Sequence, residues 1–239
     1  MLYAKVVLGL PIDGPFDYFV PTDLENKILP GMRVWVNFRN KKEVAYVVGL
    51  SNKTKIKRVK EISAVIDAAA VLDELMLLLS KRLADYYCCS WGEAIETALP
   101  DELRKGKIDP TPISGKIDLT PGFLQGQERM PVYLREIKEA WAVKRSVIVL
   151  FSDIAEAEKA KELIEKDLGT EVFLAFRKQP KELEAWAKIR QVEHCVVVGT
   201  RSSIFSPVNN LGLIIIDQEQ EQVYNLRRIR ASSYSLYRN

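Results

Sequence analysis

The sequence predicts an α/β protein in two parts: a small β-rich, barrel-like amino-terminal domain with two helices, then one α/β lobe with a parallel sheet. The first part is predicted by five short segments of mostly alternating polarity, separated by proline and glycine. The second part is predicted by strand and helix patterns that alternate over about 110 residues. Two apolar runs in it, 195–198 and 213–216, are continuous, which favours strands covered by helices on both faces.

The first domain is expected to contain five strands and two helices. Polarity and the bounding proline and glycine residues predict strands over 2–8, 15–21, 31–38, 43–50 and 59–66. The apolar spacing then becomes helical over 72–87, where one stripe is formed by Leu75, Leu79, Leu83 and Tyr87. A second helix is expected over 91–99, before Pro100.

The second domain is expected at 123–239, joined to the first domain (1–104) by a linker at 105–122 that is rich in lysine, proline and glycine. Periodicity predicts helices over 131–143, 154–168 and 181–191, and strands over 146–151 and 172–175. Asp153 is expected to cap the middle helix, with Glu156 as its capping-box partner, and Gly169 to end it.

Composition narrows the class of protein. Hydrophobic residues make up 47% and charged residues 28%, which is typical of a globular domain, and no apolar run approaches the roughly 18 residues of a membrane span. The cysteines, Cys88, Cys89 and Cys195, form neither a disulfide framework nor a metal clip. We therefore expect a cytoplasmic protein with no membrane partner and no metal site, in which the single histidine, His194, is structural.

The net charge of +3 is unevenly distributed along the chain. Eight basic residues and one acidic residue lie between positions 39 and 60, so this segment carries +7 and the rest of the chain −4. The basic residues are Arg39, Lys41, Lys42, Lys53, Lys55, Lys57, Arg58 and Lys60. Such a segment is either a phosphate-facing surface or a solvated loop, and the charge alone leaves both interpretations open.

The first domain resembles the amino-terminal domain of the primosomal replication-restart helicases. The shared motifs are Pro-Phe-Asp-Tyr at 15–18, Pro-Gly-Met-Arg-Val-Trp-Val-Asn-Phe at 30–38, Leu-Ala-Asp-Tyr-Tyr-Cys at 83–88 and Ala-Leu-Pro at 98–100. The resemblance implies a domain that binds the 3′ end of the nascent leading strand. The family's pocket residues fall on Phe16, Asp17 and Lys60, while the glycine that usually follows the third strand is Arg39 here.

The implied pocket has a consistent chemistry. A carboxylate beside DNA is repelled by phosphate, but it accepts a hydrogen bond from a free 3′-hydroxyl. The Phe16 ring stacks on a base of any sequence, and Lys60 neutralises a phosphate. The alternative, in which Phe16 belongs to the core and Asp17 to a turn, stays open.

The second domain resembles the first motor lobe of the same helicases at 196–207, Val-Val-Val-Gly-Thr-Arg-Ser-Ser-Ile-Phe-Ser-Pro, and at 210–217, Asn-Leu-Gly-Leu-Ile-Ile-Ile-Asp. The resemblance implies that Thr200 and Arg201 contact single-stranded DNA, and a solvated turn is the open alternative for these two residues. It also implies that Asp217 stands at the position that holds Mg²⁺ in the family. The family usually has Asp-Glu-Glu-His where this chain has Asp217, Gln218, Glu219 and Gln220. A glutamine cannot accept the proton of the attacking water.

Two further requirements of a nucleotide-driven motor are unmet in the sequence. The chain has no Gly-x-x-x-x-Gly-Lys-Ser/Thr motif, and residues 123–134 resemble the segment around it without the loop that wraps phosphates. A chain ending at Asn239 is also expected to lack a second lobe, and 105–122 is too short for the family's winged-helix domain. We therefore expect a nucleotide-dead lobe, without the ATP, Mg²⁺ and zinc that the family uses.

These features predict a DNA-binding protein that recognises 3′ ends and replication forks, without ATP hydrolysis. Its expected role is that of an accessory or regulator in replication restart, with links to DNA repair and recombination. Other restart proteins or single-strand-binding proteins are expected partners beside DNA. Two alternatives stay open: a fragment of an ATP-dependent 3′–5′ DNA helicase of the primosome, and a protein-interaction module that docks on replication proteins.

Overall fold

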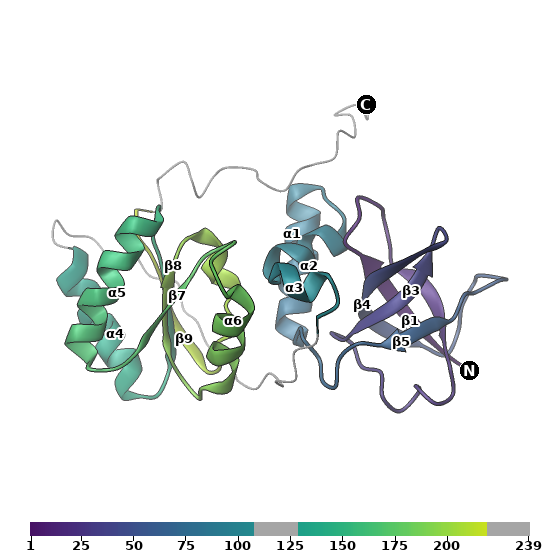
Figure 1. Ribbon diagram of the computed structural model, residues 1–239, viewed down its shortest axis with the longest axis horizontal. Coiled ribbons are helices and arrows are strands. Elements are labelled where there is room, and N and C mark those ends of the chain that lie inside the picture. Colours follow the sequence, from purple (N-terminus) through teal and green to yellow (C-terminus); the bar gives the residue numbers. More distant parts are fainter. Residues whose placement is uncertain (108–128, 219–239) are drawn as a thin grey trace. The chain divides into compact units, whose positions relative to one another are not determined.

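The computed structural model describes residues 1–107 and 129–218, which belong to two compact units (Figure 1). Each unit has its own sheet and its own hydrophobic core. The predicted fold class is confirmed, because the first unit is a curled antiparallel sheet with helices and the second is a parallel sheet with helices. The predicted linker, 105–122, lies largely outside the described residues, so its boundaries stay predictions.

Five antiparallel strands form the sheet of the first unit, in the order β2-β1-β4-β3-β5. They are β1 (Leu2–Leu8), β2 (Phe16–Val20), β3 (Arg33–Phe38), β4 (Lys41–Ser51) and β5 (Ile62–Val65). The sheet curls until its two edges meet, where the Phe19 N–H donates to the Lys60 carbonyl at 2.9 Å and Phe19 forms a bridge with Glu61. This closure removes part of the exposed strand edge.

The interior of the curled sheet is apolar because side chains of a strand alternate between its two faces. Val34 and Val36 of β3 are fully buried there, beside Val6 of β1 and Val47 of β4. On the opposite face of β3, Arg33 is buried and Asn37 is exposed.

Arg33 and Asp67 form an ion pair in which neither side chain is exposed (0% for both). Asp67 Oδ2 accepts from Arg33 Nε at 3.0 Å and from the Arg33 backbone N–H at 2.8 Å. The guanidinium also donates to the carbonyl oxygens of Leu103 and of Lys107, the latter at 2.8 Å. The pair therefore joins β3 to residues 103–107.

Three helices complete the first unit: α1 (Glu74–Tyr87), α2 (Trp91–Ala98) and the short α3 (Asp101–Arg104), which the sequence did not predict. The predicted stripe of α1 is wrong for Leu75 and Leu79, which are 45% and 37% exposed. The buried face instead contains Leu77, Ser80 and Ala84. α1 packs on α2, and the Trp91 indole N–H donates to Ser80 Oγ at 3.0 Å.

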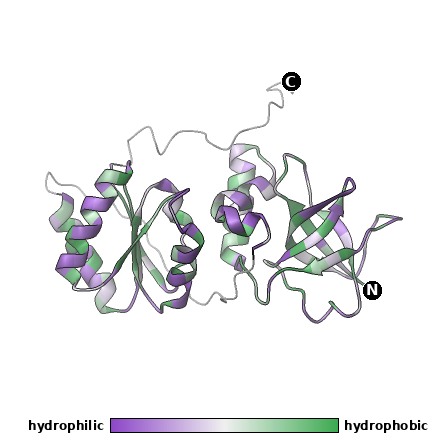
Figure 2. Ribbon diagram, in the orientation of Figure 1, coloured by the Kyte–Doolittle hydropathy of each residue, from purple (hydrophilic) through white to green (hydrophobic). Residues whose placement is uncertain are grey.

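Four parallel strands in the order β7-β8-β6-β9 form the sheet of the second unit. They are β6 (Ser146–Leu150), β7 (Val172–Ala175), β8 (Val196–Gly199) and β9 (Leu211–Ile216). α4 (Arg129–Ala142) and α5 (Ile154–Leu168) cover one face and α6 (Glu182–Gln191) the other, so hydrophobic strands lie between helices with hydrophilic outer sides (Figures 1 and 2). A 3₁₀ helix, η1 (Arg201–Phe205), follows β8.

The predicted end residues of α5, Asp153 and Gly169, are confirmed, but the predicted capping box is wrong, because the Glu156 side chain accepts from Ser152 and not from the Asp153 backbone N–H. Asp153 Oδ1 accepts from the Glu156 backbone N–H at 2.9 Å, and Gly169 ends the helix in the left-handed conformation, with φ of 65°. The Glu156 carboxylate accepts from the Ser152 hydroxyl at 3.3 Å. Across the described ranges of both units, every helix is too short or too polar to cross a bilayer.

Arg33→Met should lower the stability of the first unit by about 3–5 kcal/mol, because the Asp67 carboxylate would stay buried without its cation. Arg33→Met combined with Asp67→Asn should recover most of this loss, since no buried charge remains. Hydrogen exchange of the β4 amides reports the opening free energy of this unit separately from that of the second unit. Wild-type exchange in the single variant would contradict the expected role of the pair.

Candidate nucleic-acid interface

One end of the curled sheet brings two aromatic rings and two cations together. The rings of Phe16 and Phe38 lie 5.3 Å apart, tilted by 54°, and both side chains are half-buried. The Arg39 guanidinium carbon lies 5.4 Å from the centroid of the Phe38 ring. Half-buried rings beside exposed cations are the combination that stacks bases and contacts phosphates.

The Lys60 side chain lies at the same end of the sheet, where it donates a hydrogen bond to the carbonyl group of Asn37. This oxygen accepts from Lys60 Nζ at 3.4 Å and from the Tyr18 hydroxyl at 3.1 Å. Because Asn37 precedes Phe38, the exposed Lys60 side chain lies next to the aromatic pair. We call Phe16, Phe38, Arg39 and Lys60 the rim cluster.

The backbone explains why this end of the sheet favours glycine. The two-residue turn between β3 and β4 has positive φ at both positions, 48° at Arg39 and 63° at Asn40, as in a type I′ hairpin. A residue with a side chain is disfavoured there by roughly 1–2 kcal/mol. Where the resembling helicases have glycine, this chain thus tolerates backbone strain and gains an exposed cation beside Phe38.

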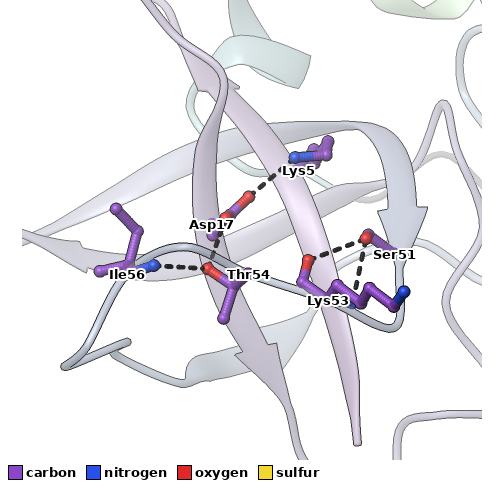
Figure 3. Close-up of polar contacts among 6 residues, drawn as sticks. All are labelled: Lys5, Asp17, Ser51, Lys53, Thr54 and Ile56. Carbon is purple, nitrogen blue, oxygen red and sulfur yellow. Dashed lines mark hydrogen bonds and ion pairs between the residues drawn. The ribbon is translucent and has the colours of Figure 1, made fainter.

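Asp17 does not point toward the rim cluster. Neighbouring side chains of a strand lie on opposite faces, and Asp17 faces Lys5 and Thr54 while Phe16 packs partly against the core. Asp17 Oδ1 accepts from Lys5 Nζ at 3.1 Å, and Asp17 Oδ2 accepts from the Thr54 hydroxyl at 2.6 Å (Figure 3). The side chain is only 12% exposed.

These contacts keep the Asp17 carboxylate ionised. The hydrogen bond from Thr54 is the main reason that the pKa of Asp17 lies below its ordinary value of 3.8. Burial acts in the opposite direction, and the hydrogen bond and positive charge of Lys5 lower the pKa further. At neutral pH this position therefore presents a negative charge that already accepts two hydrogen bonds.

The structure divides the basic segment into two groups. Lys41 and Lys42 begin β4 beside the rim cluster, and Lys42 Nζ lies 4.6 Å from the centroid of the Trp35 ring. The rest of the 11-residue strand β4 lies between them and Lys53. Lys53, Lys55, Lys57 and Arg58 are exposed on the loop 52–59, which begins after β4 and ends next to Lys60.

In the second unit, the strand-end carboxylate is occupied by side chains of α4. Arg129 Nη1 donates to both oxygens of Asp217, at 2.6 and 2.8 Å, and the Tyr133 hydroxyl donates to Oδ1 at 2.8 Å. The Asp217 side chain is 3% exposed. With its amide oriented to satisfy its neighbours, Gln218 also accepts from Arg129, at 2.6 and 2.9 Å.

The other residues predicted in this unit are less informative. Thr200 and Arg201 follow β8 and are half-buried at the start of η1, so their implied contact with single-stranded DNA stays a prediction. Glu219 and Gln220 lie outside the described residues.

The Cys195 thiol is buried, which raises its pKa to about 11 and keeps it protonated at neutral pH.

Known proteins are similar to the first unit and, in some cases, to nearly the whole chain. Residues 5–100 match the family model described as the PriA 3′DNA-binding domain (3′BD). The replication restart protein PriA of Treponema pallidum is 26% identical over 99% of this chain, and that of Rickettsia conorii is 27% identical over 94%. PriA of Chlamydia trachomatis is 33% identical over 41% of the chain.

The chain is similar to PriA proteins over most of its length, and its first unit carries the match to the 3′DNA-binding domain. It spans about two fifths of the length of its curated relatives, 42% of the Treponema protein and 38% of the Rickettsia protein. The family model covers the first unit from β1 to the end of α2, and therefore includes the rim cluster, Asp17 and the loop 52–59.

Five contact residues were not predicted from the sequence: Lys5, Phe38, Thr54, Arg129 and Tyr133. The signal for Phe38 was its place at the end of the strand that precedes Arg39. Arg129 and Tyr133 are spaced by four, which puts them on one face of a helix. Lys5 and Thr54 had no local signal, because each meets Asp17 only through the pairing of strands or the path of a loop.

An NMR titration of the Asp17 carboxyl carbon should give a midpoint below 3.8, and Thr54→Val should raise it, because the main hydrogen bond is lost. Since the folded-state pKa is depressed, the ionised carboxylate stabilises the fold above the unfolded-state pKa. This stabilisation is lost as the pH falls through the folded-state pKa. A wild-type midpoint at or above 3.8 would show that the Thr54 and Lys5 contacts do not form in solution.

Proposed function

We propose that this chain binds DNA at replication forks and 3′ ends through its first unit, as an accessory or regulator of replication restart, and without ATP hydrolysis in its second unit. The observation that carries the proposal is the rim cluster inside the segment that matches the 3′DNA-binding domain. Its two rings can stack on any of the four bases, and its two cations can neutralise the adjoining phosphates.

In this proposal the terminal nucleotide straddles the start of β2. Its base stacks on the rings of Phe16 and Phe38, a contact worth roughly 1–3 kcal/mol per base. Its 3′-hydroxyl reaches Asp17 on the neighbouring face. A carboxylate has about four lone-pair sites, of which Lys5 and Thr54 use two, so the ionised Asp17 can accept a further hydrogen bond. A 3′-phosphate offers a second anion in place of this donor.

We infer that the second unit does not hydrolyse ATP, because its strand-end carboxylate is already paired with Arg129. A Mg²⁺ ion at Asp217 would have to displace two hydrogen bonds from this arginine and one from Tyr133. The sequence has no P-loop to wrap the phosphates. Gln218, in the position of the family's glutamate, cannot take a proton from water.

We further infer a cytoplasmic role linked to DNA repair and recombination, with restart or single-strand-binding proteins as partners. PriA relatives named as replication restart proteins are the support for this part of the proposal. The open alternative of a protein-interaction module differs in one measurable respect, because such a module needs no affinity for DNA.

The chain should bind a fork with a 3′-hydroxyl at least about tenfold more tightly than the same fork with a 3′-phosphate, since a charge-assisted hydrogen bond is worth roughly 1.5–3 kcal/mol. Phe16→Leu should weaken binding to both forks by removing the stacking surface. Phe19→Leu is the matched control, because Phe19 is also half-buried on β2 but lies on the other face, against Tyr3. Fluorescence anisotropy measures the affinities. Equal affinities for both ends, with Phe16→Leu silent, would contradict the proposal.

The chain should show no DNA-stimulated ATPase activity in a phosphate-release assay. Arg129→Ala combined with Gln218→Glu frees the strand-end carboxylate and restores the missing base, yet should create no activity, because the phosphate-wrapping loop is still absent. Magnesium-dependent turnover in the wild type that disappears in Asp217→Ala would contradict this part of the proposal.

A further inference from the structure

The loop 52–59 is the most cationic exposed segment of the first unit. It carries Lys53, Lys55, Lys57 and Arg58 and no acidic residue, and all four basic side chains are exposed. Like charges at such spacing repel one another and extend a free chain. A loop of this composition needs a specific contact if it is to hold one position on the sheet.

One side-chain contact supplies this attachment. Within the ranges described, the hydrogen bonds of residues 52–59 to the sheet are two to Ser51, the adjoining last residue of β4, and one from the Thr54 hydroxyl to Asp17 Oδ2 of β2, at 2.6 Å (Figure 3). The other hydrogen bonds of the loop are local. Ser51 Oγ donates to the Lys53 carbonyl at 2.9 Å, and the Ile56 N–H donates to Thr54 Oγ1 at 3.1 Å.

Thr54 is therefore bonded on both sides. Its hydroxyl donates to the sheet and accepts from the loop, so the turn from Thr54 to Ile56 is tied directly to β2. Asp17 is 12% exposed and is held in turn by Lys5 of β1, which keeps its carboxylate in a defined position. The positive charge of Lys5 also favours the ionised form of this carboxylate.

We propose that Thr54 and Asp17 form an anchor that fixes the cationic loop 52–59 on the sheet, and that this fixed position gives the loop its affinity for the phosphodiester backbone of DNA. Thr54 is then a positioning residue, which acts through the loop and does not touch DNA. The inference rests on the proposed DNA-binding function. It assigns Asp17 a second task, separate from accepting a 3′-hydroxyl, because the two tasks use different lone pairs of one carboxylate.

The anchor matters for affinity because ordering a loop on binding has an entropic cost. A loop that is already ordered presents its cations to the DNA without that cost, whereas a released loop must be ordered on each binding event. The effect concerns the backbone, which is the same for both kinds of 3′ end. Loss of the anchor should therefore weaken binding to a 3′-hydroxyl and to a 3′-phosphate by the same factor.

The first arm of the test is hydrogen exchange of the loop in the DNA-free full chain. Thr54→Val removes the hydroxyl and keeps the shape of the side chain, and should speed the exchange of the Ile56 amide together with its neighbours in 52–59. Thr54→Ser keeps the hydroxyl and is the matched control, with exchange close to that of the wild type. Unchanged exchange in Thr54→Val would overturn the anchor.

The second arm is binding to one oligonucleotide with either a 3′-hydroxyl or a 3′-phosphate, at several salt concentrations. Thr54→Val should bind both about three- to tenfold more weakly, with an unchanged preference for the hydroxyl. Its salt dependence should fall toward that of a variant lacking Lys55, Lys57 and Arg58. Asp17→Asn should lose affinity and preference together. Wild-type affinity in Thr54→Val would overturn the proposal.

The two arms separate this inference from the function on which it rests. A wild-type chain that binds neither oligonucleotide would overturn the proposed function together with the affinity part of the inference. Faster exchange in Thr54→Val with unaltered DNA affinity would retain the proposed function and overturn only the link between the anchor and binding.

Discussion

The backbone hydrogen bond from Phe19 to Lys60 closes the curled sheet of the first unit, and the arrangement of the candidate interface depends on it. It brings Lys60 beside Asn37 and the rim cluster. It also fixes the end of the loop 52–59, whose beginning is fixed by the pairing of Ser51 with Tyr3. With both ends held at the sheet, Thr54 is positioned to meet Asp17. One closure thus brings an aromatic pair, a lysine and a cationic loop to β2.

The chain contains two carboxylates that resemblance to helicases connects with function, and their surroundings differ. Asp17 accepts one hydrogen bond from a lysine and one from a hydroxyl, and keeps lone pairs and some exposure. Asp217 is almost fully buried and accepts from both Arg129 and Tyr133. The first can still take a ligand that donates a hydrogen bond, whereas the second has its positive partner within the protein. This contrast supports the proposed DNA binding by the first unit and the proposed lack of ATP hydrolysis in the second.

Local patterns in the sequence predicted most of the fold. Alternation located β3, the continuous apolar runs located β8 and β9, and the Asp153 and Gly169 signals located the ends of α5, because each depends only on neighbouring residues. The face of α1 was mistaken since Ser80 and Ala84 are buried by α2, a packing choice that helical periodicity does not determine. The burial of Arg33 likewise depends on Asp67, 34 positions away.

The candidate site was less predictable for the same reason. Resemblance pointed to Phe16, Asp17 and Lys60, but their contacts are not local. Thr54 lies 37 positions from Asp17, and Arg129 lies 88 positions from Asp217. The basic residues between 39 and 60 looked like one patch in the sequence, yet the 11-residue strand β4 carries them to its two ends. Where charged residues lie on a sheet depends on strand length and strand pairing. Counting charges along the sequence reveals neither of these.

The most direct measurement is photocrosslinking from 4-thiothymidine placed either at the 3′ terminus of an oligonucleotide or several nucleotides inward. The account predicts that the terminal base crosslinks to peptides that contain Phe16 or Phe38, and that the inward base crosslinks to the loop 52–59. The same peptides from both positions, or crosslinks from the terminal base confined to the second unit, would contradict it.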